Sequence, residues 1–351
     1  MALFSWISIA CFVTSALAAA VPRPELVARQ SLCPNDAGNA GTFSQACATY
    51  ANAVSCPFGI QGKAGGIVLL VHGTSGSPQG TWVNGPYVQL LPKAGPGFDV
   101  CWVSLPNAAL GDAQSTAEYI AYNIKALAAK SKTGKIGLVS HSQGGLNVQW
   151  ALDFWPAYRP LVSAFVGIAP DFHGTGEGGL ACLAENITLG GCQASIIQQT
   201  IGSRFLGALL AKGNQALVPT TSIYTTYDEI IQPEINPVTS QLSGASNVRV
   251  QNYCGPGYVI GHTQIPYASY PYYLAVNALT NQAPANPAAV PSTLCAWAQS
   301  GALLTQFQNG IGLLAEDLTA VYTTAVAMRT KTEPLLKPYV CARGDATSYC
   351  G

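Results

Sequence analysis

The sequence predicts an α/β fold built on a mostly parallel, doubly wound sheet, with a small cap excursion and a C-terminal helical segment. The run at 67–71 (IVLLV) is apolar throughout, which is typical of a strand buried on both faces of a parallel sheet. The stretch 113–130 has helical spacing, because Ala117, Ile120 and Ile124 share one face. Further runs continue an alternation that short βα crossovers would produce. They are predicted strands at 100–104, 136–139, 162–169 and 222–226, and a predicted helix at 144–154.

The composition indicates a large apolar core and excludes several classes of protein. The chain has 351 residues, in which 16 Lys and Arg balance 16 Asp and Glu. Charged residues make up 9% of it, against about 25% in an average soluble domain. A neutral chain without basic runs lacks the electrostatic footprint of a nucleic-acid-binding protein, and 49% hydrophobic residues are too many for a disordered chain. We therefore expect one domain over 30–351, although length alone would allow two.

The first eighteen residues have the pattern of a signal peptide. Their apolar stretch ends in small residues at Ala16 and Ala18, which signal peptidases favour. A buried helix or a membrane anchor is the alternative, but the apolar run is short for a membrane span. Residues 19–29 then read as a pro-segment that ends near Arg29. These features predict a secreted, extracellular protein without stable membrane insertion, which we expect to be a monomer.

Cysteine usage agrees with an oxidising compartment. Removing Cys11 with the leader leaves ten of the 11 cysteines, an even number that predicts disulfides. Proximity suggests three pairs: Cys33–Cys47, Cys182–Cys192 and Cys341–Cys350. Spacing alone leaves four cysteines unconnected: Cys56, Cys101, Cys254 and Cys295. Because the chain has no CxxC motif and only four histidines, we expect no metal site and no cofactor.

The stretch 172–215 interrupts the alternation of strands and helices. It is Gly-rich and irregular, which is usual for a cap, and it is either a lid over an apolar cleft or a disulfide-stapled surface loop. The sequon at Asn186 predicts a glycosylation site that faces solvent. Further on, residues 282–291 read as a Pro- and Ala-rich linker to a helical segment at about 302–328.

The sequence SHSQG at 140–144 predicts a nucleophilic serine, Ser142. It lies directly between a predicted strand and a predicted helix, where a tight turn can hold a serine in a strained conformation. Only small residues fit two positions to either side, and Ser140 and Gly144 are both small. The alternative is an ordinary turn with a helix-capping serine.

A serine of this kind needs a base, and the usual chain order in this architecture is Ser, then Asp or Glu, then His. His262 is the only histidine that follows both Ser142 and the cap. It lies in YVIGHT, where an apolar stretch ends at Gly261 as in a loop beyond a late strand. We expect structural roles for His72 and His173.

Four acidic residues lie between Ser142 and His262, and Asp228 is the best candidate for orienting the base. Asp228 follows a predicted strand and lies 34 residues before His262. Asp171 also follows a strand and is the main rival, so we expect it near the cleft. Asp153 lies in the helix after the turn and should point away, and Glu229 should form structural hydrogen bonds.

The tetrahedral intermediate of acyl transfer needs hydrogen-bond donors for its oxyanion. The residue after the nucleophile supplies one backbone N–H and the loop after the first strand supplies another. These would come from Gln143 and Thr74, with the Thr74 hydroxyl as a further donor. The alternative reading of HGTSGS as a phosphate loop is disfavoured because the lysine of that motif is absent.

Several motifs together resemble the fungal lipase B family of α/β-hydrolases. They are VLLVHGTSG, CWVSLP, SHSQGGLNVQW, APDFHGT, VPTTSIYTTYDEIIQP and YCGPGYVIGH, which follow one another from about residue 56 to about residue 295. The resemblance implies hydrolysis of carboxylic esters and triacylglycerols. It implies the same catalytic residues, Ser142, Asp228 and His262, and the same oxyanion hole, Thr74 and Gln143. It also implies disulfides Cys56–Cys101 and Cys254–Cys295.

Departures from the family concern the substrate pocket. The family's best-known member has tryptophan at the position of His141, so here the pocket for the alcohol part is expected to be wider and more polar. Gln199 and Ile230 match pocket-lining positions and are expected to contact the acyl chain. Asp171 is expected to be a polar group in the same region.

The leading hypothesis is therefore a secreted triacylglycerol lipase or carboxylesterase that acts on lipid or ester substrates, including those at an oil–water interface. A cutinase-like polyester hydrolase is the second hypothesis. A non-catalytic secreted binding protein that kept the hydrolase fold is the third.

Overall fold

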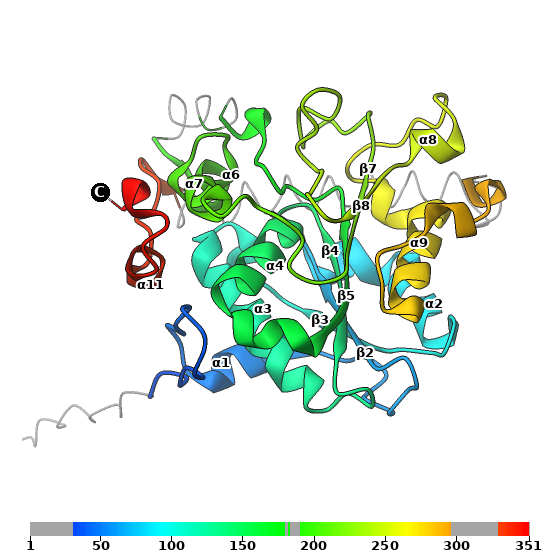
Figure 1. The fold of residues 1–351 in the computed structure, drawn as a ribbon, viewed down its shortest axis with the longest axis horizontal. Helices are drawn as coiled ribbons and strands as arrows, with labels where there is room; N and C mark the ends of the chain where they lie inside the picture. The colour runs from blue at the N-terminus through cyan, green and yellow to red at the C-terminus, as the bar shows by residue number, and fades with distance from the viewer. Residues whose placement is uncertain (1–30, 180–181, 183–189, 296–328, 351) are drawn as a thin grey trace, which may run out of the picture. The chain divides into compact units, whose positions relative to one another are not determined.

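A mostly parallel sheet forms the centre of the computed structural model, which describes residues 31–179, 182, 190–295 and 329–350 (Figure 1). Within these residues the sheet has seven strands in the order β1-β3-β2-β4-β5-β7-β8, and only β1 runs antiparallel to its neighbour. The strands are β1 Val54–Ser55, β2 Ile67–Val71, β3 Asp99–Val103, β4 Ile136–His141, β5 Val162–Ile168, β7 Thr220–Tyr224 and β8 Ser246–Arg249. The prediction of an α/β fold with a parallel sheet is confirmed.

Helices cover both faces of the sheet, which explains the uninterrupted apolar strands. Helices α1 (Cys47–Asn52), α3 (Ala113–Ala128) and α4 (Gln143–Phe154) lie on one side of it, and α2 (Pro86–Leu90) and α9 (Ser269–Asn281) on the other (Figure 1). In β2, Ile67, Leu69 and Val71 belong to the core on the α3 side. Val68 and Leu70 belong to the core on the α9 side. Because successive strand residues point to opposite faces, a strand covered on both sides, such as β2, favours apolar residues at every position.

Most predicted elements occur within two residues of their predicted ends. The predicted strand at 222–226 begins earlier, as β7, because its pairing with β5 starts at Thr220 opposite Phe165. Strand β8 and helix α9 were not predicted. The remaining elements are helices α6 Ala194–Gln199, α7 Arg204–Leu210, α8 Gln251–Cys254 and α11 Pro338–Ala342, strands β6 Cys192–Gln193 and β9 Arg329–Thr330, a π-helical turn Gln79–Val83, and 3₁₀ turns Leu91–Lys93, Pro106–Ala109, Pro156–Leu161, Ile265–Tyr267, Pro287–Ala289, Ser292–Cys295 and Thr347–Tyr349.

Part of the predicted cap excursion is anchored to the rest of the fold. The Phe205 ring of α7 stacks on the Trp150 ring of α4, with 4.1 Å between centroids and 10° between planes. The N-terminus of α7 is capped by Ser203, whose Oγ accepts the N–H of Leu206 at 3.2 Å. Strand β6 pairs with β9, far along the chain. The described residues of α7 are therefore part of the core rather than a loose covering.

Five disulfides connect the described cysteines, as predicted from proximity and from the family resemblance. They are Cys33–Cys47, Cys56–Cys101, Cys182–Cys192, Cys254–Cys295 and Cys341–Cys350. The predicted signal peptide (1–18), the pro-segment (19–29), the sequon at Asn186 and the helical segment at about 302–328 lie outside the described residues.

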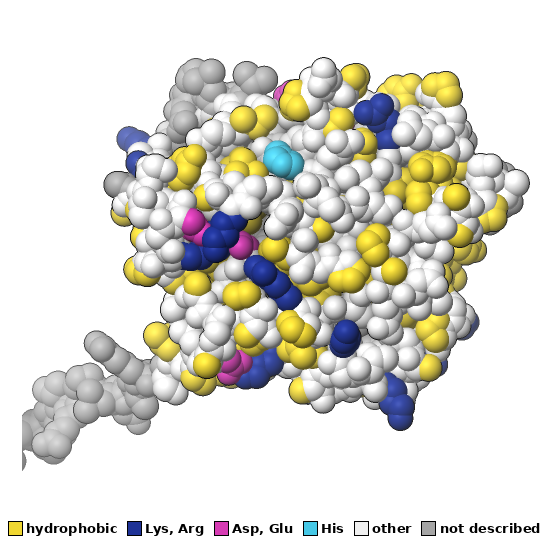
Figure 2. Space-filling model, viewed as in Figure 1, with side chains coloured by type: hydrophobic (Ala, Val, Ile, Leu, Met, Phe, Trp, Pro, Cys, Tyr) yellow, Lys and Arg dark blue, Asp and Glu magenta, His cyan; other side chains and the backbone are white. Residues whose placement is uncertain are grey.

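Some of the few charged side chains form ion pairs. On the face shown in Figure 2, some basic side chains lie beside acidic ones, others have no acidic side chain next to them in this view, and hydrophobic side chains are scattered. Arg343 pairs with both Asp153 and Asp345, and Lys212 also reaches Asp345 at 2.9 Å. Among the described helices, none combines the length and the apolar character that a membrane span needs.

Candidate active site

Ser142 lies at a sharp turn between strand β4 and helix α4. It is the N-cap of α4 and has φ 56° and ψ −134°, a positive φ that residues other than glycine rarely adopt. Its N–H donates to the carbonyl oxygen of Ile168 on the neighbouring strand at 3.0 Å. Strain of this kind persists only where the surroundings impose it, and it is common at functional sites. The strand–serine–helix arrangement is the one that the sequence predicts.

Glycines make room for this turn. A Cβ atom on Gly144 would lie 2.8 Å from the carbonyl oxygens of both Val71 and His72, which belong to the backbone and cannot rotate away. A Cβ atom on Gly73 would lie 2.6 Å from Cβ of Ser142. The loop after β2 and the serine turn therefore pack in direct contact. This contact brings Thr74, the next residue, to the region of Ser142.

His262 and Asp228 form a buried pair. Nδ1 of His262 lies 2.8 Å from Oδ2 of Asp228, and both side chains are almost fully shielded from solvent. The other oxygen, Oδ1, accepts the backbone N–H groups of Ile230 at 2.9 Å and Ile231 at 2.7 Å. Since an ionised carboxylate only accepts, Nδ1 carries the proton and Nε2 is the basic atom of the ring. The carboxylate thus fixes both the tautomer and the orientation of the imidazole.

Glu229 holds the backbone of the histidine loop. Its Oε2 accepts the N–H of His262 at 2.7 Å, so this exposed carboxylate contacts the loop rather than the ring. A Cβ atom on Gly261 would lie 2.5 Å from the same oxygen, so the carboxylate packs closely against this loop position. This placement agrees with a structural role for Glu229.

His141 connects the serine turn to the histidine loop. Its ring lies 4.6 Å from the ring of His262, and its Nε2 lies 3.0 Å from the carbonyl oxygen of His262. Because that carbonyl oxygen only accepts, Nε2 of His141 carries a proton. Burial holds the pKa of His141 well below its usual range, with His262 adding to the decrease. His141, the residue directly before Ser142, is thus a neutral side chain that contacts the loop of the candidate base. The sequence suggests a pocket-lining role for it and does not reveal this contact.

The side chains of Thr74 and Gln143, the two residues predicted to form an oxyanion hole, contact each other. The hydroxyl of Thr74 donates to Oε1 of Gln143 at 2.5 Å, a bond that the hydroxyl would exchange for one to the oxyanion. Nε2 of Gln199 donates to Oγ1 of Thr74 at 3.0 Å and thereby joins the same group. The sequence-predicted pocket residue Gln199 therefore lies at the candidate oxyanion hole.

His72 fixes the loop that carries Thr74. Its Nδ1 lies 2.9 Å from the carbonyl oxygen of Gly73, and its Nε2 accepts the N–H of Leu105 at 3.0 Å. Burial lowers the pKa of His72 to about 4, so the ring stays neutral and keeps one tautomer at neutral pH. This histidine therefore has a structural position, as the sequence suggests.

The rival acidic residues lie in other environments. Asp171 is fully buried, and neither of its carboxyl oxygens has a hydrogen-bond partner among the described residues. Burial raises its pKa well above the usual range, and the carboxylates of Asp228 and Glu234 add to the increase. Burial thus favours the protonated form of Asp171, which is a poorer partner for an imidazolium than a carboxylate is. Asp153 points away from the turn, where it pairs with Arg343 and Arg159.

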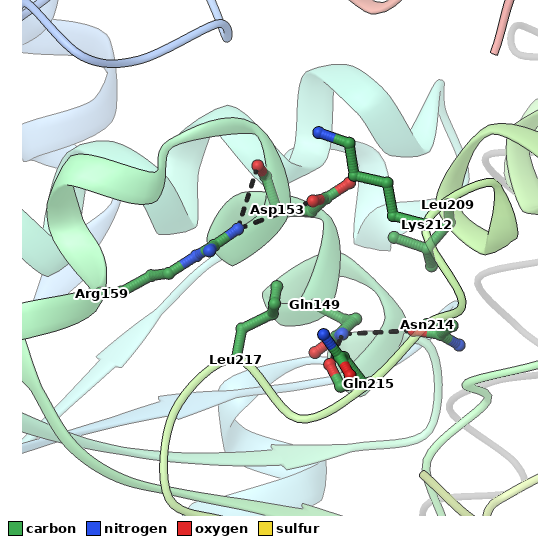
Figure 3. A pocket seen from close by; sticks show the side chains of 8 residues that line it. All are labelled: Gln149, Asp153, Arg159, Leu209, Lys212, Asn214, Gln215 and Leu217. Carbon is green, nitrogen blue, oxygen red and sulfur yellow. Dashed lines mark hydrogen bonds and ion pairs between the residues drawn. The ribbon is translucent and has the colours of Figure 1, made fainter. Parts of the chain in front are cut away.

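A polar hollow of about 160 Å³ lies at the far end of α4 (Figure 3). Gln149, Asp153 and Arg159 face it, and an ion pair joins the last two at 3.6 Å. It is small and charged, and none of the predicted catalytic residues lines it. The hollow is therefore not the candidate site of ester hydrolysis. Within the described part of the chain, no group of three or more His, Cys, Asp or Glu residues could hold a metal ion.

The parallel sheet, the strained serine after β4 and the Asp–His pair from later loops define the chain as an α/β-hydrolase. Lipase B from Pseudozyma antarctica is 35% identical to it over 248 residues, which cover 69% of this chain and 70% of the relative. The crystal structure of Aspergillus fumigatus lipase B has a TM-score of 0.77 and 32% identity, and the match covers 89% of this chain and 76% of that one. No protein-family model matches. The chain belongs to the lipase B family and is a carboxylic-ester hydrolase.

Proposed function

We propose that the protein hydrolyses carboxylic esters, including triacylglycerols, through an acyl-enzyme on Ser142. The hydrogen bond between Nδ1 of His262 and Oδ2 of Asp228 is the main support, because it leaves Nε2 as the base. Nε2 takes the proton of the Ser142 hydroxyl as Oγ attacks the ester carbonyl carbon. The tetrahedral intermediate then expels the alcohol, which receives that proton from His262.

Water then hydrolyses the acyl-enzyme, with His262 again transferring the proton. His262 takes a proton from water while the water oxygen attacks the acyl carbon, and the acid leaves as Ser142 regains its proton. Asp228 stays ionised throughout and stabilises the transient imidazolium. Burial of this pair strengthens that interaction, because little water remains to screen it.

The oxyanion of each tetrahedral intermediate would receive hydrogen bonds from the backbone N–H groups of Gln143 and Thr74 and from the Thr74 hydroxyl. Gln199, which bonds to Thr74, and Ile230, whose N–H bonds to Asp228, are assigned to the acyl side of the pocket. His141 and Asp171 complete the proposed pocket. Five disulfides among the described residues support secretion.

Replacing Thr74 with valine is expected to lower kcat by about 10²- to 10³-fold, because it removes one oxyanion donor while keeping the side-chain shape. KM should change much less, since the lost bond forms mainly in the transition state. Steady-state kinetics on a soluble ester check this. A fall in kcat/KM caused by KM alone would contradict the assigned role of the hydroxyl.

Ester hydrolysis and covalent labelling test the proposed function together. A panel of p-nitrophenyl esters of graded chain length should be hydrolysed, and a serine-directed phosphonate should label the protein at Ser142, as mass spectrometry of the labelled peptide would show. A folded protein that neither hydrolyses any ester nor reacts with the phosphonate would be a binding protein. Activity on polyester films with little turnover of triacylglycerol would favour the polyester hydrolase instead.

A further inference from the structure

A second acidic side chain, Glu234, is buried close to Asp228. Glu234 follows Asp228 by six residues in the same loop, and neither it nor Ser240, its hydrogen-bonding partner, is exposed. The titratable groups that interact with Glu234 electrostatically are Asp228, Asp171 and His262. The mechanism proposed above uses neither Glu234 nor Ser240.

The hydrogen bonds around Ser240 indicate where a proton lies. Oγ of Ser240 is 2.7 Å from the carbonyl oxygen of Pro170 and is also hydrogen-bonded to Oε1 of Glu234. A serine hydroxyl has one proton, a carbonyl oxygen has none to give, and an ionised carboxylate has none either. Each contact is a separate two-centre hydrogen bond if the serine donates to Pro170 and the glutamic acid O–H donates to the serine, whereas an ionised carboxylate would have to share the single serine proton with Pro170. The first arrangement requires Glu234 to be neutral.

The surroundings of Glu234 favour the neutral acid independently of this proton count. Its other oxygen, Oε2, is buried and has no hydrogen-bond partner among the described residues, which would be costly for a carboxylate. Burial raises the pKa of Glu234 to about 8; Asp228 contributes to the increase, whereas Ser240 and His262 oppose it. Burial raises the pKa of Asp171 as well, so the protonated form is favoured at both of these neighbours of Asp228.

We propose that Glu234 is a positioning residue that acts as a neutral carboxylic acid: it ties the loop of Asp228, through Ser240, to the backbone of Pro170 beyond strand β5. The loop then keeps Asp228 against His262 without adding a second negative charge beside the pair. The kinetic part of this inference rests on the proposed roles of His262 and Asp228. Ionisation at alkaline pH would remove the proton that joins Glu234 to Ser240 and so loosen this link.

The sign of the stability effect follows from the raised pKa. Glu234 titrates at about 8 in the folded protein, above its ordinary value of 4.5, so the folded state binds its proton more tightly than the unfolded state. Its contribution to stability is complete below pH 4.5, declines as pH rises and is lost above pH 8. Glutamine has the shape of the neutral acid and an N–H in place of its O–H, but it does not ionise.

The test compares Glu234→Gln with wild type, and with Glu177→Gln as a matched control at an exposed glutamate. We expect the two variants and wild type to have similar Tm at pH 5, and Glu234→Gln to exceed the others by about 3 °C or more at pH 9. For wild type and Glu177→Gln, kcat/KM should fall with an apparent pKa of about 8, whereas Glu234→Gln should show no decline there.

Infrared spectroscopy reads the proton directly and does not depend on catalysis. The wild-type-minus-Glu234→Gln difference spectrum at pH 6 should contain the carbonyl band of a protonated carboxylic acid, which disappears in the wild-type spectrum as pH is raised through 8. Absence of this band at pH 6, or parallel pH profiles for Glu234→Gln and wild type, would overturn the inference. If the proposed function were wrong, ester hydrolysis would not depend on Ser142, but the carbonyl band and the Tm difference would still be observed.

Discussion

Replacing Ser142 with alanine is expected to lower kcat for ester hydrolysis by about 10⁶-fold, the scale of losing the nucleophile in a serine hydrolase. The acyl-enzyme cannot form without the hydroxyl, and only the oxyanion donors and substrate binding remain to act on a direct attack by water. Initial rates on a soluble p-nitrophenyl ester at high enzyme concentration measure the loss. Phosphonate labelling should be lost in the same variant.

Ser140→Ala is the matched control. Ser140 is also buried and lies in strand β4, two residues before Ser142, and its Oγ has no hydrogen-bond partner among the described residues. Its substitution should leave kcat within a few-fold of wild type, because alanine is equally small at this position of the turn. Equal losses in both variants would mean that the turn has been disturbed rather than that a nucleophile has been removed. Residual activity of Ser142→Ala near the wild-type level would refute the acyl-enzyme.

The buried strands and the serine turn could be predicted because their signals are local. A run such as 67–71 indicates burial on both faces, and the serine motif needs only its neighbouring strand and helix. Strand β8 gave no such signal, because Val248 is its only buried residue. Helix α9 has an apolar face at Tyr270, Leu274 and Ala278, but Pro271 near its start and its many tyrosines concealed the helical spacing. Proline is tolerated in the first turn of a helix, where its missing N–H has no partner to lose.

The residues of the candidate site likewise fall into those that the sequence can predict and those that depend on three-dimensional packing. Chain order and the small number of histidines single out Ser142 and His262, since neither depends on three-dimensional packing. Choosing between Asp228 and Asp171 does depend on it, because both follow strands of the same sheet. The raised pKa values of Asp171 and Glu234 arise from burial by segments far apart in sequence. A sequence pattern shows that these residues are acidic and cannot show that they keep their protons.

Replacing Asp228 with asparagine is expected to lower kcat by about 10⁴-fold, while Asp171→Asn should cost far less. The difference follows from charge. Asparagine at 228 removes the negative charge beside Nδ1 of His262 and can present an N–H to it, which favours the wrong tautomer. Asparagine at 171 replaces a carboxyl whose pKa burial raises well above its usual range, so we expect the electrostatics at His262 to change little.

Single-turnover rates for the two variants at pH 7 compare these effects at the chemical step, and circular dichroism establishes that both are folded. The pair of variants is informative because both acids follow strands of the sheet and both are buried. Asp228 is the one with a hydrogen bond to the imidazole of His262. A loss of about 10⁴-fold in Asp171→Asn, with Asp228→Asn near wild type, would transfer the orienting role to Asp171. That result would also require His262 to turn away from the carboxylate it contacts here, because one Nδ1–H cannot serve both acids.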